Sequence, residues 1–186
     1  MSHETSKANV RRRREGYFDR VFEGHGIDIG CGDDPVTEEC VHWDIEDGDA
    51  ENLIGVPSEV FNWVYSSHCL EHLRNPRRAL ARWWEILKTG GYLMFVVPDE
   101  DLYEQGIWPS RFNTGHLWSF TSSKASSWSS ASVNVTELVA SLPNRRLVWI
   151  RTCDDGYDYS GGVWDRTGGP AEAHIEVLVQ KLASRP

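Results

Sequence analysis

Short apolar runs separated by polar and glycine-rich segments dominate the pattern of this chain. Runs of this length, bounded by turn residues, are typical of strands that are buried on both faces of a parallel sheet. The strongest covers residues 92–97 and is closed by Pro98. The pattern predicts strands at residues 26–30, 40–44, 60–66, 92–97, 147–151 and 173–182.

Helical spacing predicts the elements between these strands. Asn75 and Pro76 begin a helix whose apolar residues recur at helical spacing, and Gly90 ends it. Further helices are predicted at residues 12–22, from Pro35 onward with Asp34 as N-cap, and at 135–142. The alternation of strand, helix and strand predicts right-handed parallel βαβ units. We expect residues 1–15 to form a flexible tail and residues 99–132, which lack regular periodicity, to form an insertion on the substrate side.

A glycine-rich loop (DIGCG, residues 28–32) follows the first predicted strand. Glycines there let the backbone turn sharply and approach a ligand without obstruction by a Cβ atom. In the dinucleotide-binding fingerprint a third glycine would occupy the position of Pro35, and Asp33 and Asp34 would repel a pyrophosphate. A cationic ligand without phosphate fits this loop better, and S-adenosylmethionine, with its sulfonium and ammonium groups, is such a ligand.

The end of the second predicted strand supports this interpretation. Asp44 lies where an acidic side chain can accept hydrogen bonds from both ribose hydroxyls, although it could instead cap a turn. The following segment (DGDA, residues 47–50) offers a carboxylate and a backbone N–H that can recognise an adenine edge.

Together with residues 67–73 (SHCLEHL) and 87–93 (LKTGGYL), these segments resemble the class I methyltransferases, and more closely their type 11 (UbiE-like) branch, over about residues 25–100. The resemblance implies an α/β Rossmann-like fold: a seven-stranded, mostly parallel sheet with its last strand antiparallel and helices on both faces. It also implies a single domain over residues 1–186 that uses S-adenosylmethionine and releases S-adenosylhomocysteine. Residues and resemblance together assign cofactor binding to Asp28, Gly30, Cys31, Gly32, Asp44, Ile45, Asp49, Ala50, Ser67 and His68.

The sequence departs from the family pattern in two respects. Asp34 replaces the third family glycine. The connection from Ile29 to Val41 is barely long enough for a parallel crossover. We therefore expect the first helices to be shortened.

Residues 68–72 (HCLEH) also match the pattern His-x-x-Glu-His, which holds zinc in some peptidases. In a helix, His68 and His72 would share one face. However, the segment directly follows a buried strand, and the Asn75-Pro76 pair breaks any helix soon afterwards. We therefore predict no metal site and retain a zinc hydrolase only as the rival function.

Methyl transfer requires a group that orients the acceptor and takes its proton if the acceptor is a hydroxyl. His116 is the first candidate for this base, Asp99 the second and His72 the third. The insertion mixes acidic, aromatic and basic side chains, which suits a polar, ring-shaped acceptor such as a sugar. The prediction is O-methylation of a small polar molecule or glycan unit. N-methylation of a small molecule and a non-catalytic cofactor-binding subunit of a larger methyltransferase are the alternatives.

Composition narrows the possible partners. The 28 acidic and 19 basic residues give a net charge of -9, whereas nucleic-acid binding requires a basic face. The basic run at residues 11–14 is expected to form a solvated helix face, so we expect no nucleic-acid partner. No apolar run approaches the ~20 residues of a membrane span. Four scattered cysteines predict reduced thiols in the cytoplasm, and the oligomeric state stays open.

Overall fold

The computed structural model describes residues 3–166 and 169–184, and its main feature is a mixed sheet. Within these residues the sheet has six strands in the order β2-β1-β3-β4-β8-β7. Their bounds are β1 Gly26–Ile29, β2 Val41–Trp43, β3 Phe61–Ser67, β4 Leu87–Pro98, β7 Arg145–Cys153 and β8 His174–Lys181. Strand β1 pairs in parallel with β2 and β3, and β3 pairs in parallel with β4. Strand β8 runs antiparallel to both neighbours, β4 and β7. The prediction of a mostly parallel sheet with an antiparallel last strand is confirmed, with six strands in the described sheet in place of seven.

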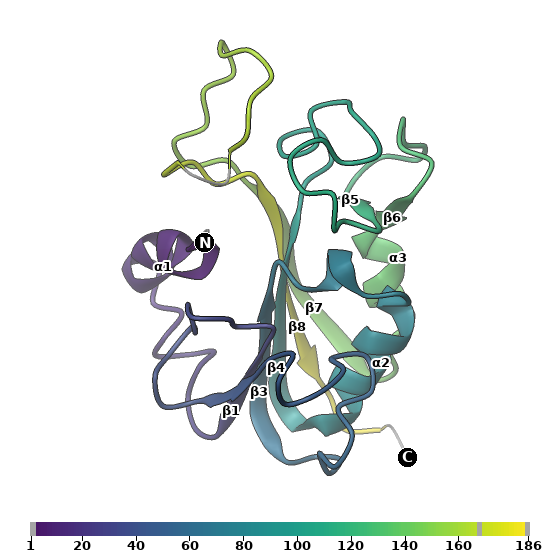
Figure 1. Ribbon diagram of the computed structural model, residues 1–186. Coiled ribbons are helices and arrows are strands. Elements are labelled where there is room, and N and C mark those ends of the chain that lie inside the picture. Colours follow the sequence, from purple (N-terminus) through teal and green to yellow (C-terminus); the bar gives the residue numbers. More distant parts are fainter. Residues whose placement is uncertain (1–2, 167–168, 185–186) are drawn as a thin grey trace.

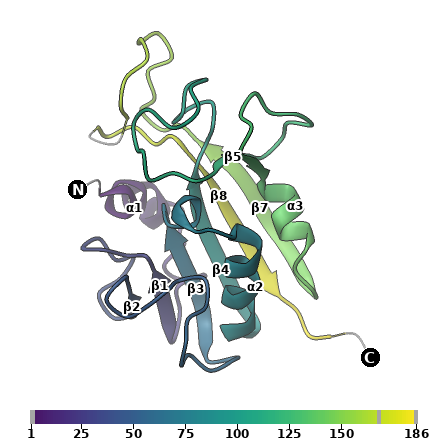
Figure 2. The same cartoon turned by 45° about the vertical axis from the view of Figure 1, so that its right-hand side comes forward.

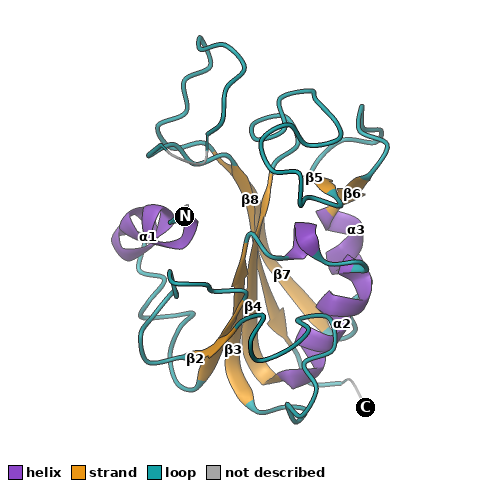
Figure 3. Ribbon diagram, in the orientation of Figure 1, coloured by secondary structure: helices purple, strands orange, loops and turns teal. Residues whose placement is uncertain are grey.

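Helices cover both faces of this sheet, as predicted. Helix α1 (Glu4–Arg14) lies on one face, and α2 (Pro76–Ile86) and α3 (Val135–Ala140) lie on the other (Figures 1 and 3). The turned view separates the strands and shows α2 and α3 along one side of the sheet (Figure 2). A short 3-10 turn, η1 (Leu70–His72), follows β3. Two short parallel strands, β5 (Ser119–Thr121) and β6 (Ser132–Asn134), lie within or at the end of the predicted insertion, where no strand was expected.

Two apolar clusters, one on each face, hold the sheet in place. Trp83 and Leu80 of α2 pack with Val64 and Phe95 of the central strands. On the opposite face Trp63 packs with other aromatic and apolar side chains, including Phe22. A Cβ atom on Gly26 would lie 1.9 Å from the Trp63 ring, so the indole occupies space that only glycine leaves open. The short apolar runs of the sequence therefore form strands, because both faces of these strands are covered by other parts of the protein.

The N-terminal segment differs from the prediction. We expected a tail over residues 1–15 and a helix over 12–22, whereas α1 spans Glu4–Arg14 and packs against the sheet. The expectation of a solvated basic face is wrong for Arg11 and Arg12, which are buried. Their guanidinium groups bond to the carboxylates of Glu172 and Glu176 near and on β8. This pairing of buried opposite charges attaches helix α1 to strand β8 and the residues just before it.

The first crossover also differs from the prediction. The expected helix from Pro35 does not form, and residues 30–40 consist of turns and loop. The Asp34 carboxylate accepts a hydrogen bond from the Ser6 amide (2.9 Å) and another from the Ser6 hydroxyl, so it joins this loop to α1 and does not cap a helix of its own. The crossover is too short for a helix, and α1 lies beside it on the same face of the sheet.

The second crossover begins as predicted, but its helix ends at Ile86 and not at Gly90, so the predicted end is wrong. Asn75 is the N-cap of α2, and its side chain accepts a hydrogen bond from the Arg78 amide (3.0 Å). Pro76 occupies the first turn, where its missing N–H costs nothing. Strand β4 begins at Leu87, directly after the helix and before Gly90. Among the described residues, none of the helices is both long and apolar enough to cross a membrane.

Candidate functional site

Two adjoining pockets lie at the carboxyl ends of β1, β2 and β3. The larger has a volume of about 600 Å³ and the smaller about 240 Å³. Gly30, Asp44 and His68 line both pockets, so the two pockets are adjacent. This is where open α/β sheets generally bind ligands.

The glycine loop forms the floor between the two pockets. Gly30 has a φ of +75°, and a Cβ atom there would lie 2.6 Å from the Cβ of Cys69. Both facts require glycine at this position. The Gly30 amide donates to the Trp43 carbonyl (2.7 Å), which holds the loop against the end of β2.

Asp28, a predicted cofactor-binding residue, lies beneath this loop and lines neither pocket. Its side chain is buried, and one oxygen accepts a hydrogen bond from the Val36 amide (2.8 Å). Burial raises the pKa of Asp28 to about 8, although the Val36 amide opposes the shift. Asp28 therefore shapes the loop from inside the protein.

Asp44 connects the loop to the larger pocket. One carboxylate oxygen accepts the Gly32 amide (2.6 Å), and the other accepts the Ile45 amide (2.7 Å). Asp44 thus caps a turn, and it also lines both pockets; its contact with ribose hydroxyls stays a prediction. Cys31, Gly32 and Ser67 line the smaller pocket.

Apolar side chains line much of the larger pocket. Trp43, Ala50 and Leu73 contribute to its wall, and Ile45, 84% exposed, lies at its edge. Asp49 also lines this pocket, but its carboxylate already accepts hydrogen bonds from the Glu51 amide (2.8 Å) and the Asn52 side chain (2.7 Å). The pocket can therefore accept a flat apolar ring beside a polar group at Asp44.

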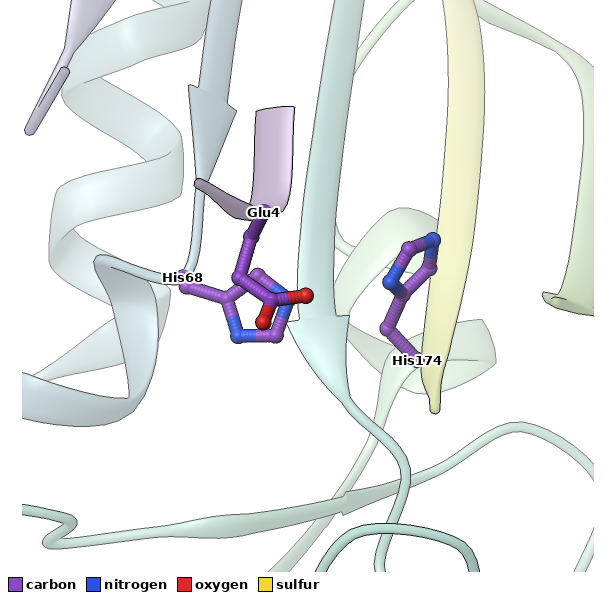
Figure 4. Close-up of side chains that lie close together, drawn as sticks. All are labelled: Glu4, His68 and His174. Carbon is purple, nitrogen blue, oxygen red and sulfur yellow. The ribbon is translucent and has the colours of Figure 1, made fainter. Parts of the chain in front are cut away.

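His68 lies where the two pockets meet and belongs to a cluster with Glu4 and His174 (Figure 4). Its Nε2 atom is 3.8 Å from a Glu4 oxygen, and its Nδ1 atom is 3.5 Å from a Glu71 oxygen. Burial lowers the pKa of His68, but Glu71 and Glu4 raise it to a net value above the ordinary one. Glu4 comes from α1, so the N-terminal helix contributes to the wall of the smaller pocket.

A second cluster contains two of the predicted catalytic residues. The rings of His72 and His116 meet edge to face, with centroids 5.0 Å apart. His72 is exposed and lines the larger pocket, whereas His116 is buried behind it. The Nδ1 atom of His116 lies 2.7 Å from a Glu104 oxygen, and its Nε2 atom lies 3.9 Å from a Glu71 oxygen. The fold therefore brings together residues that are far apart in the sequence.

Sequence reasoning did not assign a catalytic or cofactor role to Glu71 or Glu104. Glu71 belongs to the zinc-like motif and to the segment 67–73 of the family resemblance, and no local pattern distinguishes Glu104 from the other acidic residues of the insertion. Burial raises the pKa of Glu71, but the neighbouring histidines, His68 first, lower it to a net value below the ordinary one.

The Asp99 side chain bonds to its own turn and lies outside both pockets. Its side chain is buried, and one oxygen accepts the amides of Asp101 (2.9 Å) and Leu102 (3.1 Å). Burial raises the pKa of Asp99 despite these hydrogen bonds. Asp99 lines neither of the two pockets, so the structure separates it from the histidine pair.

The zinc-peptidase arrangement does not form in the His68–His72 segment. Only the three residues of η1 are helical, and His68 precedes them with a φ of +51°. His68 faces Glu4, whereas His72 contacts the carbonyl of Gly115 (Nδ1 to O, 3.0 Å). The two histidines therefore belong to different clusters and share no helix face.

The insertion is attached to the chain that follows β3. The Leu117 amide donates to the Glu71 carbonyl (2.8 Å), and the Trp118 indole donates to the Leu73 carbonyl (2.9 Å). These bonds place His116 beside His72. Residues 115–118 therefore contact the segment that contains His72 and Leu73, which line the larger pocket.

Comparison with known proteins gives both a family and a fold. A family model described as a methyltransferase domain matches residues 8–135. No protein with a curated description matches the sequence.

Several solved structures share the fold. A SAM-dependent methyltransferase from Archaeoglobus fulgidus has a TM-score of 0.58 and 17% identity, covering 97% of this chain and 95% of that one. The YcgJ protein from Bacillus subtilis has a TM-score of 0.57 and 14% identity, covering 96% and 99%. A complex of the Haloferax volcanii Trm112 methyltransferase activator with its methyltransferase has a TM-score of 0.56 and 12% identity, covering 98% and 99%.

Proposed function

The chain belongs to the methyltransferase domain family, and we propose that it transfers a methyl group from S-adenosylmethionine to a hydroxyl oxygen of a small polar molecule or a glycan unit. The prediction of a methyltransferase is confirmed by this membership, and S-adenosylmethionine is the methyl donor that such domains use. The matched range, residues 8–135, includes the glycine loop, Asp44 and both histidines of the second cluster.

The shape and charge of the two pockets fit this cofactor. Gly30 leaves the floor open where a Cβ atom would collide with Cys69. The smaller pocket is lined by Glu4, Asp33 and Asp34 in addition to Asp44, which suits the positive ammonium and sulfonium groups. When bound, S-adenosylmethionine supplies a methyl group made electrophilic by its positively charged sulfur.

Each part of the two pockets then has a separate binding task. We assign the ribose hydroxyls to Asp44, because its carboxylate lies where the two pockets join. The apolar wall of the larger pocket suits the adenine ring. The position of Asp44 in the lining of both pockets is the observation that carries the proposal.

The acceptor would approach from the side of the insertion. His72 lines the larger pocket, and His116 is held behind it by Glu104. An imidazole can take a hydroxyl proton at neutral pH, and a carboxylate on its far nitrogen orients it for that task. We therefore place proton removal at the His72–His116 pair and not at Asp99, whose carboxylate caps a turn.

The Haloferax volcanii complex, in which a methyltransferase is bound to an activator, gives a reason to test a partner-dependent alternative. Under that alternative this chain would bind the cofactor without acting alone. If the purified chain alone converts S-adenosylmethionine to S-adenosylhomocysteine in the presence of an acceptor, this alternative is excluded.

The test is a screen followed by one substitution. The purified chain is incubated with S-adenosylmethionine and a panel of sugars and other small hydroxylated compounds, and S-adenosylhomocysteine is measured. With an accepted compound, His116→Ala should lower turnover by roughly 10²- to 10⁴-fold, because proton removal is impaired, while cofactor affinity changes little.

His25→Ala is the matched control, because His25 is exposed and lies before β1, away from both pockets. It should retain full turnover. Activity of His116→Ala within a few-fold of the original would exclude a role for His116 in the reaction.

A further inference from the structure

Two buried carboxylates flank His116, and their hydrogen bonding is incomplete. The Glu71 and Glu104 side chains are fully buried. Neither Glu71 oxygen, nor the second Glu104 oxygen, has a hydrogen-bond partner among the described residues, and the His68 Nδ1 atom lies 3.5 Å from one Glu71 oxygen. Buried carboxylates ordinarily have partners or coordinate a metal ion, because an isolated buried charge is costly.

The histidines of this cluster are oriented as metal ligands usually are. His116 places Nδ1 against the Glu104 carboxylate, which leaves Nε2 facing Glu71. His72 places Nδ1 against the Gly115 carbonyl, which leaves its Nε2 available. A metal-binding histidine generally donates its other ring N–H to a carboxylate or a backbone carbonyl, and both kinds of partner are present here.

We propose that Glu71, His72 and His116 bind a divalent transition metal ion of the zinc type. One potential ligand atom from each residue lies within 4.8 Å of the other two. Ligands about 2.0–2.2 Å from a shared tetrahedral ion lie about 3.3–3.6 Å apart, so side-chain movements of about 1 Å would complete the site. Two imidazoles and one carboxylate are a donor set found in catalytic zinc sites.

The position of the site indicates what the ion would do. Glu71 and His116 are buried, whereas His72 is exposed and lines the larger pocket. The coordination positions that the protein leaves open would therefore face that pocket. Resting on the proposed function, we infer that the ion would hold an acceptor oxygen there and favour loss of its proton, so that His72 and His116 would serve as ligands of the ion and would not themselves take the proton.

This site differs from the one considered in the sequence. The sequence predicts no metal site, on the argument that His68 and His72 do not share a helix face; the present proposal departs from that prediction, because His116 and not His68 lies beside His72. The cluster of His68, Glu4 and His174 is less suited to an ion, because the Lys7 ammonium already lies 2.7 Å from the Glu4 carboxylate.

The experiment measures metal binding directly. The chain is purified without a metal-affinity tag, stripped with a chelator and titrated with Zn²⁺ by calorimetry. We expect one Zn²⁺ per chain. His116→Ala should weaken binding by at least 10-fold, and Glu104→Gln, which removes only the orienting carboxylate, by about 10- to 100-fold. Co²⁺ in place of Zn²⁺ should give the visible absorption of a low-symmetry site.

His25→Ala, which removes an exposed histidine elsewhere, should bind Zn²⁺ as the original does. Circular dichroism and S-adenosylmethionine binding identify any variant that fails to fold. Absence of stoichiometric Zn²⁺ in the original chain, or unchanged affinity in both His116→Ala and Glu104→Gln, would overturn the metal site. Methyl transfer that persists in the zinc-free chain would also overturn the role given to the ion, while leaving the proposed function in place.

Discussion

Asp44 shows how one side chain can serve both the fold and the site. Its two oxygens accept the amides of Gly32 and Ile45, and its own amide donates to Asp47 (2.9 Å). The carboxylate is therefore fixed at the junction of the two pockets before any ligand arrives. A ligand that bonds to it has little ordering of this side chain to offset.

Asp44→Ala should weaken S-adenosylmethionine binding by about 1–3 kcal/mol, or about 5- to 150-fold, because ribose hydroxyls would lose their acceptor. Calorimetric titration of the purified chain measures this. Asp19→Ala removes the same charge at an exposed position and should leave the affinity unchanged. Equal affinities in the two variants, or tighter binding of NAD than of S-adenosylmethionine by the original chain, would contradict the assignment.

The residues gathered at the pockets show how far the sequence could predict the site. Gly30 and Asp44 follow predicted strands directly, so the parallel sheet brings them to one edge. Asp99 also follows a strand, but its nearest partners are the amides of its own turn, which a strand pattern does not reveal. The contact of His116 with Glu104 depends on how a long insertion folds back, and no local pattern encodes it.

At the scale of elements, α1 and α2 show two different origins of a helix. Helix α2 carries an apolar stripe and an Asn75-Pro76 start, so its sequence predicts it. Helix α1 is strongly polar, and buried Arg11 and Arg12 hold it to carboxylates near and on β8. Hydrophobic periodicity cannot reveal ion-pair partners about 160 residues away, and for this reason the sequence predicted a tail over residues 1–15.

Arg12→Met should therefore reduce the free energy of unfolding substantially. Arg12 donates to Glu176 (2.9 Å) and to the Tyr65 hydroxyl (2.7 Å) in a fully buried position. Removing one partner of a buried ion pair costs about 3–5 kcal/mol. We expect about 3 kcal/mol, the low end, because Arg11 and Arg151 still contact Glu176.

Urea denaturation followed by tryptophan fluorescence measures this change. Arg14→Met, on the exposed side of the same helix, is the control and should alter stability by less than about 0.5 kcal/mol. Similar effects of the two substitutions would mean that burial of the arginine does not stabilise α1.

At the scale of the whole molecule, ion pairs join helix α1, near the start of the chain, to strand β8, near its end. Arg11 and Arg12 of α1 and Arg151 of β7 converge on Glu176 of β8, and Arg11 also pairs with Glu172. Glu4 and Thr5 of the same helix line the smaller pocket. The charge network therefore helps to keep the wall of the proposed cofactor site in position.

This network makes the free energy of unfolding depend on pH in the acidic range. Burial raises the pKa of Glu172, but His174 and Arg11 lower it more strongly, from 4.5 to about 2. The arginines hold the pKa of Glu176 further below its ordinary range, against the effect of burial. A carboxyl group whose pKa is lower in the folded chain stabilises it fully above the unfolded pKa, and that contribution is lost as pH falls through the folded pKa.

The free energy of unfolding should therefore decrease as pH falls from about 5 to 2, with Glu172 contributing on the order of 3 kcal/mol. Urea denaturation at intervals across this range measures the slope. Glu172→Gln cannot titrate, so its curve should start lower at neutral pH and fall less steeply. Glu38→Gln, which removes an exposed carboxylate, should follow the original curve. Parallel curves for the original chain and Glu172→Gln would show that this ion pair does not link stability to pH.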